Sequence, residues 1–305
     1  MTRPNKVVGL AEAVATIADG SVVAIGGHTL RRHPMAMVRE LVRQRKRDLH
    51  VMGWNNGIDF DLLAAAGVMR TAETSCVSLS QFGLGRNFRR AVERGELQVW
   101  DHSETTAIDV FRGAAQGAPF TPALSPLGTS MLANNPRFRV ATNPFDGREV
   151  VLVEAVRPDV ALLHQHMADR YGNVLLDPKP WLDTSFDVYI GRAAKRLIVT
   201  VEQIVSDEFV LDNPELTVLP RRYVDAVVKA PFGAHPCSCD SRYAYDTDFL
   251  QDYVDASLQE QTMQEHIASW VEIPEDEYLR RLGPRLLQTL SHPLSAQLSA
   301  TNGHD

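Results

Sequence analysis

The clearest structural signal in this sequence is the stretch SVVAIGGHTLRRHPMAMVRELVRQRKRDLHVMGWNNG, residues 21–57. A short run rich in β-branched residues, 21–25, precedes two glycines, and Pro34 then opens a helical pattern that extends to about Lys46. Proline suits the first turn of a helix because that turn needs no backbone N–H donor. A second apolar run, 49–52, completes a strand–helix–strand unit, which predicts two parallel strands.

Alternating strand and helix patterns continue along the rest of the chain. Further strands are expected over residues 97–100, 150–153, 160–164 and 197–201, and further helices over 10–18, 61–66, 186–194, 247–256 and 275–282. Repeated units of this kind predict an α/β fold in which a mostly parallel sheet is covered by helices on both faces. We expect one domain over residues 1–290, followed by a polar, disordered tail at 291–305.

The composition indicates a soluble globular protein and disfavours some partners. Of the 305 residues, 44% are hydrophobic and 23% are charged, and the formal net charge is −7. Nucleic acids and anionic membranes both favour a basic surface, so we expect neither as a partner. An apolar run of about 18 residues and an apolar leader are both missing, so we expect no membrane span and no signal peptide. The three cysteines fit a reducing cytoplasm.

The cysteine and histidine residues do not form a recognisable metal-binding pattern. Cys237 and Cys239 lie close to His235, but a second pair of ligands is missing, so we expect no metal ion. His164 and His166 are two positions apart and share one face of a strand. We expect them to make structural hydrogen bonds, because coordination normally needs a third ligand.

The candidate site is expected in the loops that follow residues 25, 52 and 164, because ligands of parallel sheets bind beyond the carboxyl ends of the strands. Gly26 and Gly27 come directly after the first strand. Glycine lets backbone N–H groups approach an anion or a developing oxyanion closely. The alternative is a tight turn that binds no ligand.

Polar side chains in the first two of these loops are candidate substrate ligands. Arg31 and Arg32 could hold a phosphate or carboxylate by bidentate bonds, or they could belong to a solvated charged loop. His28 lies beside them. Asn55 and Asn56 suit a turn, since asparagine tolerates the left-handed region, but they could also present amides to a substrate carbonyl.

Glu104 is the candidate acid or base of the site. It comes after the strand expected at 97–100 and directly after His102 and Ser103. A carboxylate or imidazole at a strand end can transfer protons. Ser103 also suits a helix N-cap, and Glu104 would then stand in a first turn that favours negative charge. The two roles are compatible.

The ordered set of these segments resembles the alpha subunit of the family I CoA-transferases, and most closely the glutaconate CoA-transferase group. The match is most specific over residues 111–122, which read FRGAAQGAPFTP. The other matching segments are residues 25–27, 48–51, 55–57, 88–97, 127–129, 164–174, 201–205 and 224–228. Together they cover roughly residues 8–255.

The resemblance implies an enzyme that moves CoA between an acyl-CoA and a carboxylic acid, with coenzyme A as a substrate and no permanently bound cofactor. The family's nucleophile is a glutamate in a Ser-Glu-Asn-Gly type motif of a beta subunit, and this chain contains no Glu-Asn-Gly. We therefore expect a beta-type partner, in an assembly such as α2β2. In this interpretation Gly26, Gly27, His28, Arg31 and Arg32 bind substrate, and Asn55 and Asn56 orient it.

One departure from the transferase pattern leaves an alternative open. Glu104 stands where the ketoacid transferases have a glutamine, and a carboxylate there is similar to the alpha subunit of the steroid-ring-opening hydrolase. The stretch from Arg31 to Met35 resembles that relative's "RR-x-P-M" motif. The alternative function is hydrolysis of a carbon–carbon bond in a CoA-linked cyclic dione, with Glu104 as acid and base. A third alternative is a catalytically inactive subunit that only binds acyl-CoA.

Overall fold

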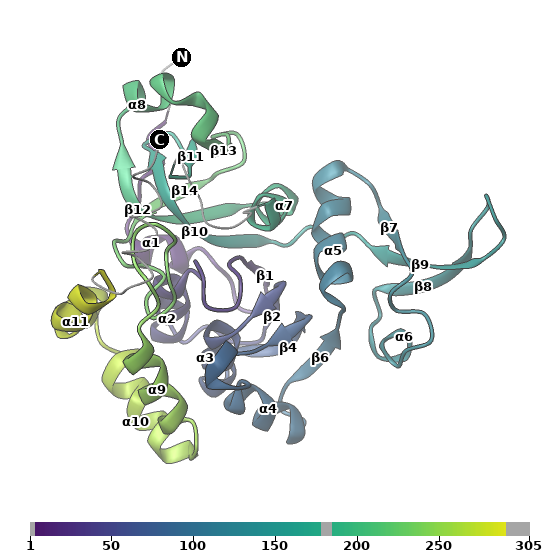
Figure 1. The fold of residues 1–305 in the computed structure, drawn as a ribbon, viewed down its shortest axis with the longest axis horizontal. Coiled ribbons are helices and arrows are strands. Elements are labelled where there is room, and N and C mark those ends of the chain that lie inside the picture. The colour runs from purple at the N-terminus through teal and green to yellow at the C-terminus, as the bar shows by residue number, and fades with distance from the viewer. Residues whose placement is uncertain (1–3, 178–184, 291–305) are drawn as a thin grey trace, which may run out of the picture.

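A large, mostly parallel sheet forms the centre of the computed structural model, which describes residues 4–177 and 185–290 (Figure 1). Its strands are β1 (Val22–Ile25), β2 (Leu49–Met52), β4 (Met69–Thr74), β6 (Gln98–Asp101), β10 (Val160–Asp169), β11 (Val174–Leu175), β12 (Leu197–Val205), β13 (Thr217–Leu219) and β14 (Ala226–Lys229). The order is β13-β11-β10-β1-β2-β4-β6, with β12 paired to β10 and β14. Only the pairs that involve β11 are antiparallel among these strands in the described residues.

Two hydrophobic cores lie on opposite faces of this sheet. In β1, Val23 and Ile25 belong to one core and Ala24 to the other, as the alternation of side chains along a strand requires. The first core is covered by α1 (Leu10–Ala15), α2 (Met35–Arg43), α3 (Ile58–Ala65) and α4 (Arg86–Glu93), and the second by α5 (Glu104–Gln116) and α7 (Ser185–Ala193). The expected helix layers on both faces are therefore present.

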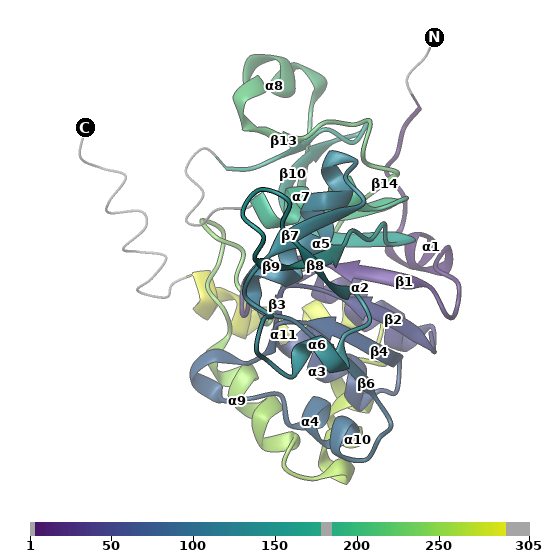
Figure 2. The same ribbon diagram turned by 90° about the vertical axis from the view of Figure 1, so that its right-hand side faces the viewer.

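Three helices lie near the end of the described chain; the first two contribute side chains to the first core, and the third packs on Phe249 in a smaller cluster. They are α9 (Thr247–Ala256), α10 (Glu260–Trp270) and α11 (Glu275–Leu290), and they lie at the end of the molecule opposite α8 (Asp207–Asp212) (Figures 1 and 2). The helix expected at 247–256 has the predicted bounds, and the one expected at 275–282 extends further. Helix α10 is not expected from the sequence, because it buries only three of its side chains and is mostly polar.

A three-stranded antiparallel arm projects beyond α5, away from the main sheet (Figure 1). Its strands are β7 (Phe120–Ala123), β8 (Phe138–Thr142) and β9 (Glu149–Glu154), in the order β7-β9-β8, with α6 (Met131–Asn134) between the first two strands in sequence. The strand expected at 150–153 belongs to this arm. Residues 150–153 alternate between half-buried and buried positions, which a short apolar run does not reveal.

Short elements complete the described chain: β3 (Asn55–Asn56), β5 (Cys76–Val77), η1 (Ser80–Phe82) and η2 (Pro214–Leu216). Strands β3 and β5 pair in parallel beside the ends of β2 and β4. None of the helices over the described ranges is long and apolar enough to cross a membrane. The expected tail at 291–305 lies outside the described residues.

Candidate functional site

The site is built from loops that leave neighbouring parallel strands at the same edge of the sheet. The glycine loop follows β1, the Trp54–Gly57 segment follows β2, Ser75 follows β4, and Glu104 follows β6. Strands β1, β2, β4 and β6 are consecutive in the sheet and parallel, so their carboxyl ends lie side by side. The fold therefore brings together residues from 28 to 104 that the sequence leaves far apart.

Asn55 and Glu104 meet at the centre of this edge. The Nδ2 atom of Asn55 donates a hydrogen bond to Oε1 of Glu104 at 2.8 Å. Ser75 Oγ donates to Oδ1 of Asn55 at 2.6 Å, which fixes the orientation of the amide. The side chain of Glu104 is exposed, while Asn55 is buried. The carboxylate of Glu104 thus faces solvent and is held on its buried side by the amide of Asn55.

Aromatic rings form a wall beside this carboxylate. The rings of His28 and Trp54 have centroids 4.8 Å apart, and Trp54 stacks on Phe186 at 3.7 Å. The indole Nε1 of Trp54 also donates to the backbone oxygen of Glu104 at 3.0 Å. Burial, with the positive charges of the neighbouring His33 and Arg31, lowers the pKa of His28, so its imidazole is neutral at pH 7.

The two glycines are required by packing. A Cβ atom on Gly26 would lie 2.3 Å from Cδ2 of Leu163 and 2.7 Å from Oδ1 of Asp187. Gly27 has a φ of 98°, and its N–H donates to Oδ1 of Asp187 at 2.9 Å. The N–H of Gly26 donates to the carbonyl of Leu162 at 3.0 Å. Because both donors are occupied, the geometry favours the tight-turn alternative for these glycines.

The adjacent arginines differ in their surroundings. Arg32 is buried; its Nη1 atom lies 2.8 Å from Oδ2 of Asp240 and its Nη2 atom lies 3.5 Å from Oδ2 of Asp187. Arg31 keeps about a third of its side chain exposed, and its Nη1 atom is 3.7 Å from Asp240. Arg32 is therefore engaged by two aspartates, whereas Arg31 is the arginine of this pair that a ligand can reach.

The two asparagines also have different environments. Asn56 is buried, donates through Nδ2 to Asp59 at 2.8 Å, and accepts from Thr74 at 2.9 Å. It fits the turn alternative. Asp59 is paired with His33. Burial opposes both charges, but the pairing outweighs it: the pKa of His33 is raised and the pKa of Asp59 is lowered. Asn55 is thus the asparagine of this pair that contacts Glu104.

The loop expected after His164 is not part of this edge, which corrects the sequence-based expectation. Strand β10 continues to Asp169 because its ladder with β12 extends over the same residues. His164 bonds Thr200 at 2.9 Å and Glu202 at 2.8 Å, and His166 bonds the backbone oxygen of Asp240 at 2.8 Å. These contacts match the structural role predicted for both histidines.

Cys239 lies near His164 and Glu202, and one potential ligand atom of each lies within 4.8 Å of the others. Burial, followed by the charge of Glu202, raises the pKa of Cys239 well above its ordinary value, so its thiol stays protonated. The carboxylate of Glu202 is already bonded to His164, to the Tyr243 hydroxyl and to the backbone N–H of Phe232. His164 and Glu202 are therefore joined by a hydrogen bond, and the protonated thiol of Cys239 lies beside them.

Several residues of the site were missed by sequence reasoning. Trp54 stands next to the predicted Asn55, and Ser75 follows β4, a strand that was not predicted; an aromatic or serine in a loop carries no specific signal. Phe186 and Asp187 lie in the first turn of α7, and Asp187 is 160 residues from the glycine it binds. The remaining contacts follow from the fold alone.

The architecture and the site define a class: an α/β protein with strand-end loops that present one exposed, hydrogen-bonded carboxylate beside aromatic rings. The family model for coenzyme A transferases matches residues 7–230, and the chain belongs to that family. This confirms the resemblance inferred from the sequence.

Known relatives agree with an alpha-type assignment. The A-type chain of the glutaconate CoA-transferase of Acidaminococcus fermentans is 34% identical, over 94% of this chain and 94% of its own length. The crystal structure of glutaconate CoA-transferase from that organism matches with a TM-score of 0.88, covering 92% of this chain and 94% of that one. The predicted fold class and the alpha-type, CoA-transferase-family assignment are both confirmed.

Two further relatives widen the range of this family. The cholesterol ring-cleaving hydrolase IpdA subunit of Rhodococcus jostii is 31% identical, over 91% of this chain and 96% of its own length. An uncharacterised protein of Archaeoglobus fulgidus is 35% identical over 92% of this chain, which spans 62% of that relative's length. Transferase and hydrolase names therefore both occur among similar chains.

Proposed function

We propose that this chain is the alpha-type subunit of a two-chain enzyme that transfers CoA between an acyl-CoA and a carboxylic acid. The observation that carries the proposal is the exposed carboxylate of Glu104, held by Asn55 at the strand ends of a CoA-transferase fold. The sequence has no Glu-Asn-Gly motif to supply the nucleophile. The proposed partner is a beta-type subunit that completes this open edge, in an α2β2 assembly.

The proposed reaction divides the chemistry between the two chains. A glutamate of the beta-type partner attacks the thioester carbonyl, expels the CoA thiolate and forms a mixed anhydride. The thiolate then attacks the glutamyl carbonyl, releases the first acid and leaves CoA on the partner as a thioester. The acceptor acid reverses these two steps. Covalent catalysis of this kind replaces one difficult exchange by easier ones.

In this scheme the alpha chain orients the acyl group. Glu104 and Asn55 face the reacting end of the substrate, and the rings of His28 and Trp54 cover one side of it. Arg31 is available for an anionic group of CoA or of the acyl chain, by charge-assisted hydrogen bonds. Coenzyme A is a substrate here, and the scheme needs no bound cofactor. We place the enzyme in the cytoplasm, with which the three free thiols are consistent.

A second candidate function is hydrolysis, which the position of Glu104 favours. One oxygen of its exposed carboxylate can accept a proton from a water molecule while Asn55 donates a hydrogen bond to the other oxygen, Oε1. The similar IpdA subunit carries the name of a ring-cleaving hydrolase. A hydrolase would use Glu104 as the acid and base and would form no glutamyl-CoA intermediate. A chain that binds acyl-CoA without turnover, even with its partner, would satisfy neither candidate.

Glu104→Gln in the assembled complex separates the candidates. A transferase keeps the glutamyl-CoA intermediate, detected by mass spectrometry, but loses about ten- to a hundredfold in kcat/KM because a group that positions the acyl chain has changed. A hydrolase loses nearly all turnover and shows no such intermediate. Glu93→Gln, at an exposed glutamate on α4 that pairs with Arg89, is the matched control and should leave kcat/KM unchanged. Absence of the intermediate in the unmodified complex would reject the transferase.

A further inference from the structure

The first turn of α5, which carries Glu104, is fixed by a capping box. Ser103 Oγ accepts a hydrogen bond from the backbone N–H of Thr106 at 3.2 Å, and the backbone N–H of Ser103 donates to Thr106 Oγ1 at 3.0 Å. A capping box satisfies two otherwise unpaired donors and sets the direction in which the chain enters a helix. The backbone of Glu104 lies between these two residues, so its position depends on them.

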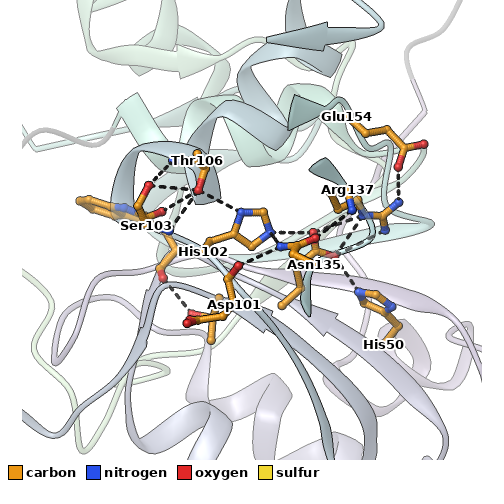
Figure 3. Close-up of polar contacts among 11 residues, drawn as sticks. His50, Asp101, His102, Ser103, Thr106, Asn135, Arg137 and Glu154 are labelled. Atoms are coloured by element: carbon orange, nitrogen blue, oxygen red, sulfur yellow. Dashed lines mark hydrogen bonds and ion pairs between the residues drawn. The ribbon is translucent and has the colours of Figure 1, made fainter. Parts of the chain in front are cut away.

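A buried histidine, His102, connects this capping box to the interior of the protein. His102 Nδ1 lies 3.2 Å from Thr106 Oγ1 (Figure 3). On the other side of the ring, His102 Nε2 lies 2.9 Å from Oε1 of Glu73. His102 and Glu73 are both almost fully buried. The imidazole therefore bridges the first turn of α5 to a carboxylate on β4.

Glu73 is ionised although it is buried. Burial alone would raise its pKa, but hydrogen bonds from His102 and His50 and the charge of Arg137 together lower the pKa to about 2. An ionised carboxylate can only accept, so His102 must donate from Nε2. The hydrogen bond to Glu73 therefore sets both the tautomer of His102 and the orientation of its ring.

Residues of the arm cover this group from the other side. Asn135 donates through Nδ2 to the backbone oxygen of Asp101 at 2.9 Å, and its Oδ1 accepts from the backbone N–H of Arg137 at 2.9 Å (Figure 3). Arg137 itself lies 3.2 Å from Oε1 of Glu73. The end of β6 is therefore held at Asp101 and His102, just before Glu104 in the chain.

We propose that Glu73 and His102 are positioning residues, which hold the first turn of α5 so that the carboxylate of Glu104 stays aligned with Asn55 at the site. The inference rests on the role of Glu104 in the proposed function. An error of about 1 Å in the placement of a reacting group can lower a rate by about a hundredfold. The Glu73–His102–Thr106 contacts are the buried connection that limits such an error.

The chain provides a matched control on the same carboxylate. His50, on β2, bonds the other oxygen of Glu73 at 2.9 Å, and its ring contacts Trp100 edge-on. It is buried like His102, but these two contacts lie on β4 and β6 rather than on α5. Replacing either histidine by asparagine removes one hydrogen bond to Glu73, and only the His102 change also removes the link to Thr106.

The test measures kcat and KM for acyl-CoA in the assembled complex for His102→Asn, His50→Asn and Glu104→Gln, and for His102→Asn combined with Glu104→Gln. We expect His102→Asn to lower kcat at least tenfold with KM changed less than twofold, and His50→Asn to lower kcat less than twofold. Thermal melting should show similar destabilisation for both histidine variants. In the Glu104→Gln background, His102→Asn should cause no further loss, because residues that act through one group are not additive.

Equal losses for the two histidine variants, or a loss from His102→Asn that persists in the Glu104→Gln background, would overturn the inference and leave the proposed function intact. Full activity of Glu104→Gln would instead reject the role of Glu104 and the positioning role with it. If His102→Asn does not assemble, Thr106→Val carries the same comparison. If Thr106→Val lowers kcat only when Glu104 is present, and not in the Glu104→Gln background, the inference is supported. If Thr106→Val leaves kcat unchanged, the inference is overturned.

Discussion

The amide of Asn55 donates to the carboxylate of Glu104 at 2.8 Å and so joins the loop after β2 to the first turn of α5. Its neighbour Asn56 bonds Asp59 and Thr74 instead, at the buried side of the same turn. Two adjacent residues of one type are thus assigned different tasks by the direction of their side chains. Replacing each asparagine in turn separates these tasks.

Asn55→Ala should lower kcat/KM of the assembled enzyme about tenfold with little change in thermal stability. The substitution removes one hydrogen bond to an exposed carboxylate, which contributes roughly 1.5–3 kcal/mol when one partner is charged and positioned. Steady-state kinetics measure kcat/KM, and a melting curve on the same preparation measures the thermal stability. A variant with normal kcat/KM would show that the Asn55–Glu104 contact has no part in turnover.

Asn56→Ala should instead destabilise the fold. Asp59 and Thr74 would each lose a partner in a buried position, and an unsatisfied buried polar group costs about 1–3 kcal/mol. Denaturant unfolding of the full chain gives the free energy directly. If the free energy of unfolding were unchanged while activity fell, Asn56 would be presenting its amide to substrate, which is the alternative that the sequence left open.

Gly26→Ala should destabilise the protein by about 1–3 kcal/mol, because the new Cβ would overlap Leu163 and Asp187 in a filled core. Gly9→Ala is the matched control, since a Cβ at that position meets no atom within 4 Å. Denaturant unfolding of both variants measures the difference. Equal stability of the two would mean that the glycine loop has room for a ligand after all.

Acid should destabilise the fold partly through Glu73. Its folded pKa of about 2 is below the ordinary value of 4.5, so the stabilisation is present above pH 4.5 and is lost as the pH falls toward 2. The loss is about 3 kcal/mol for this shift. The free energy of unfolding between pH 6 and pH 2 should therefore fall more steeply in the unmodified chain than in Glu73→Gln. Parallel pH profiles would contradict the depressed pKa.

Much of the scaffold was predictable because it depends on local patterns. The strand–helix–strand unit at 21–57, the capping of α5 by Ser103 and the place of Glu104 after β6 all follow from periodicity and capping chemistry. Strand β10 was predicted too short because the apolar run that marks it ends before His164, and polar residues continue the strand to Asp169. Its pairing with β12 satisfies the backbone there, and that pairing is a contact between distant segments.

The interior of the site could not be predicted for the same reason. Glu73 lies 29 residues from His102, and the carboxylate of Asp187 lies 160 residues from Gly27. Neither pair leaves a pattern in the sequence, because these buried hydrogen bonds depend on how distant strands are arranged in the fold. The arginine pair illustrates the limit: Arg31 and Arg32 are adjacent in sequence, but only Arg32 is buried, between the distant Asp187 and Asp240.

Cys76 should report on the charge of Glu104 in the full chain. Partial burial of its thiol, and then the negative charge of Glu104, raise the pKa of the exposed Cys76, so little thiolate is present at pH 8. Glu104→Gln removes that charge, lowers the pKa of Cys76 and should speed its alkylation by iodoacetamide, measured by mass spectrometry of the Cys76 peptide. Cys237 and Cys239 are buried and serve as internal controls that stay unmodified in the folded chain. An unchanged alkylation rate in Glu104→Gln would mean that the carboxylate points away from Cys76, and the arrangement of the site around Glu104 would then have to be redrawn.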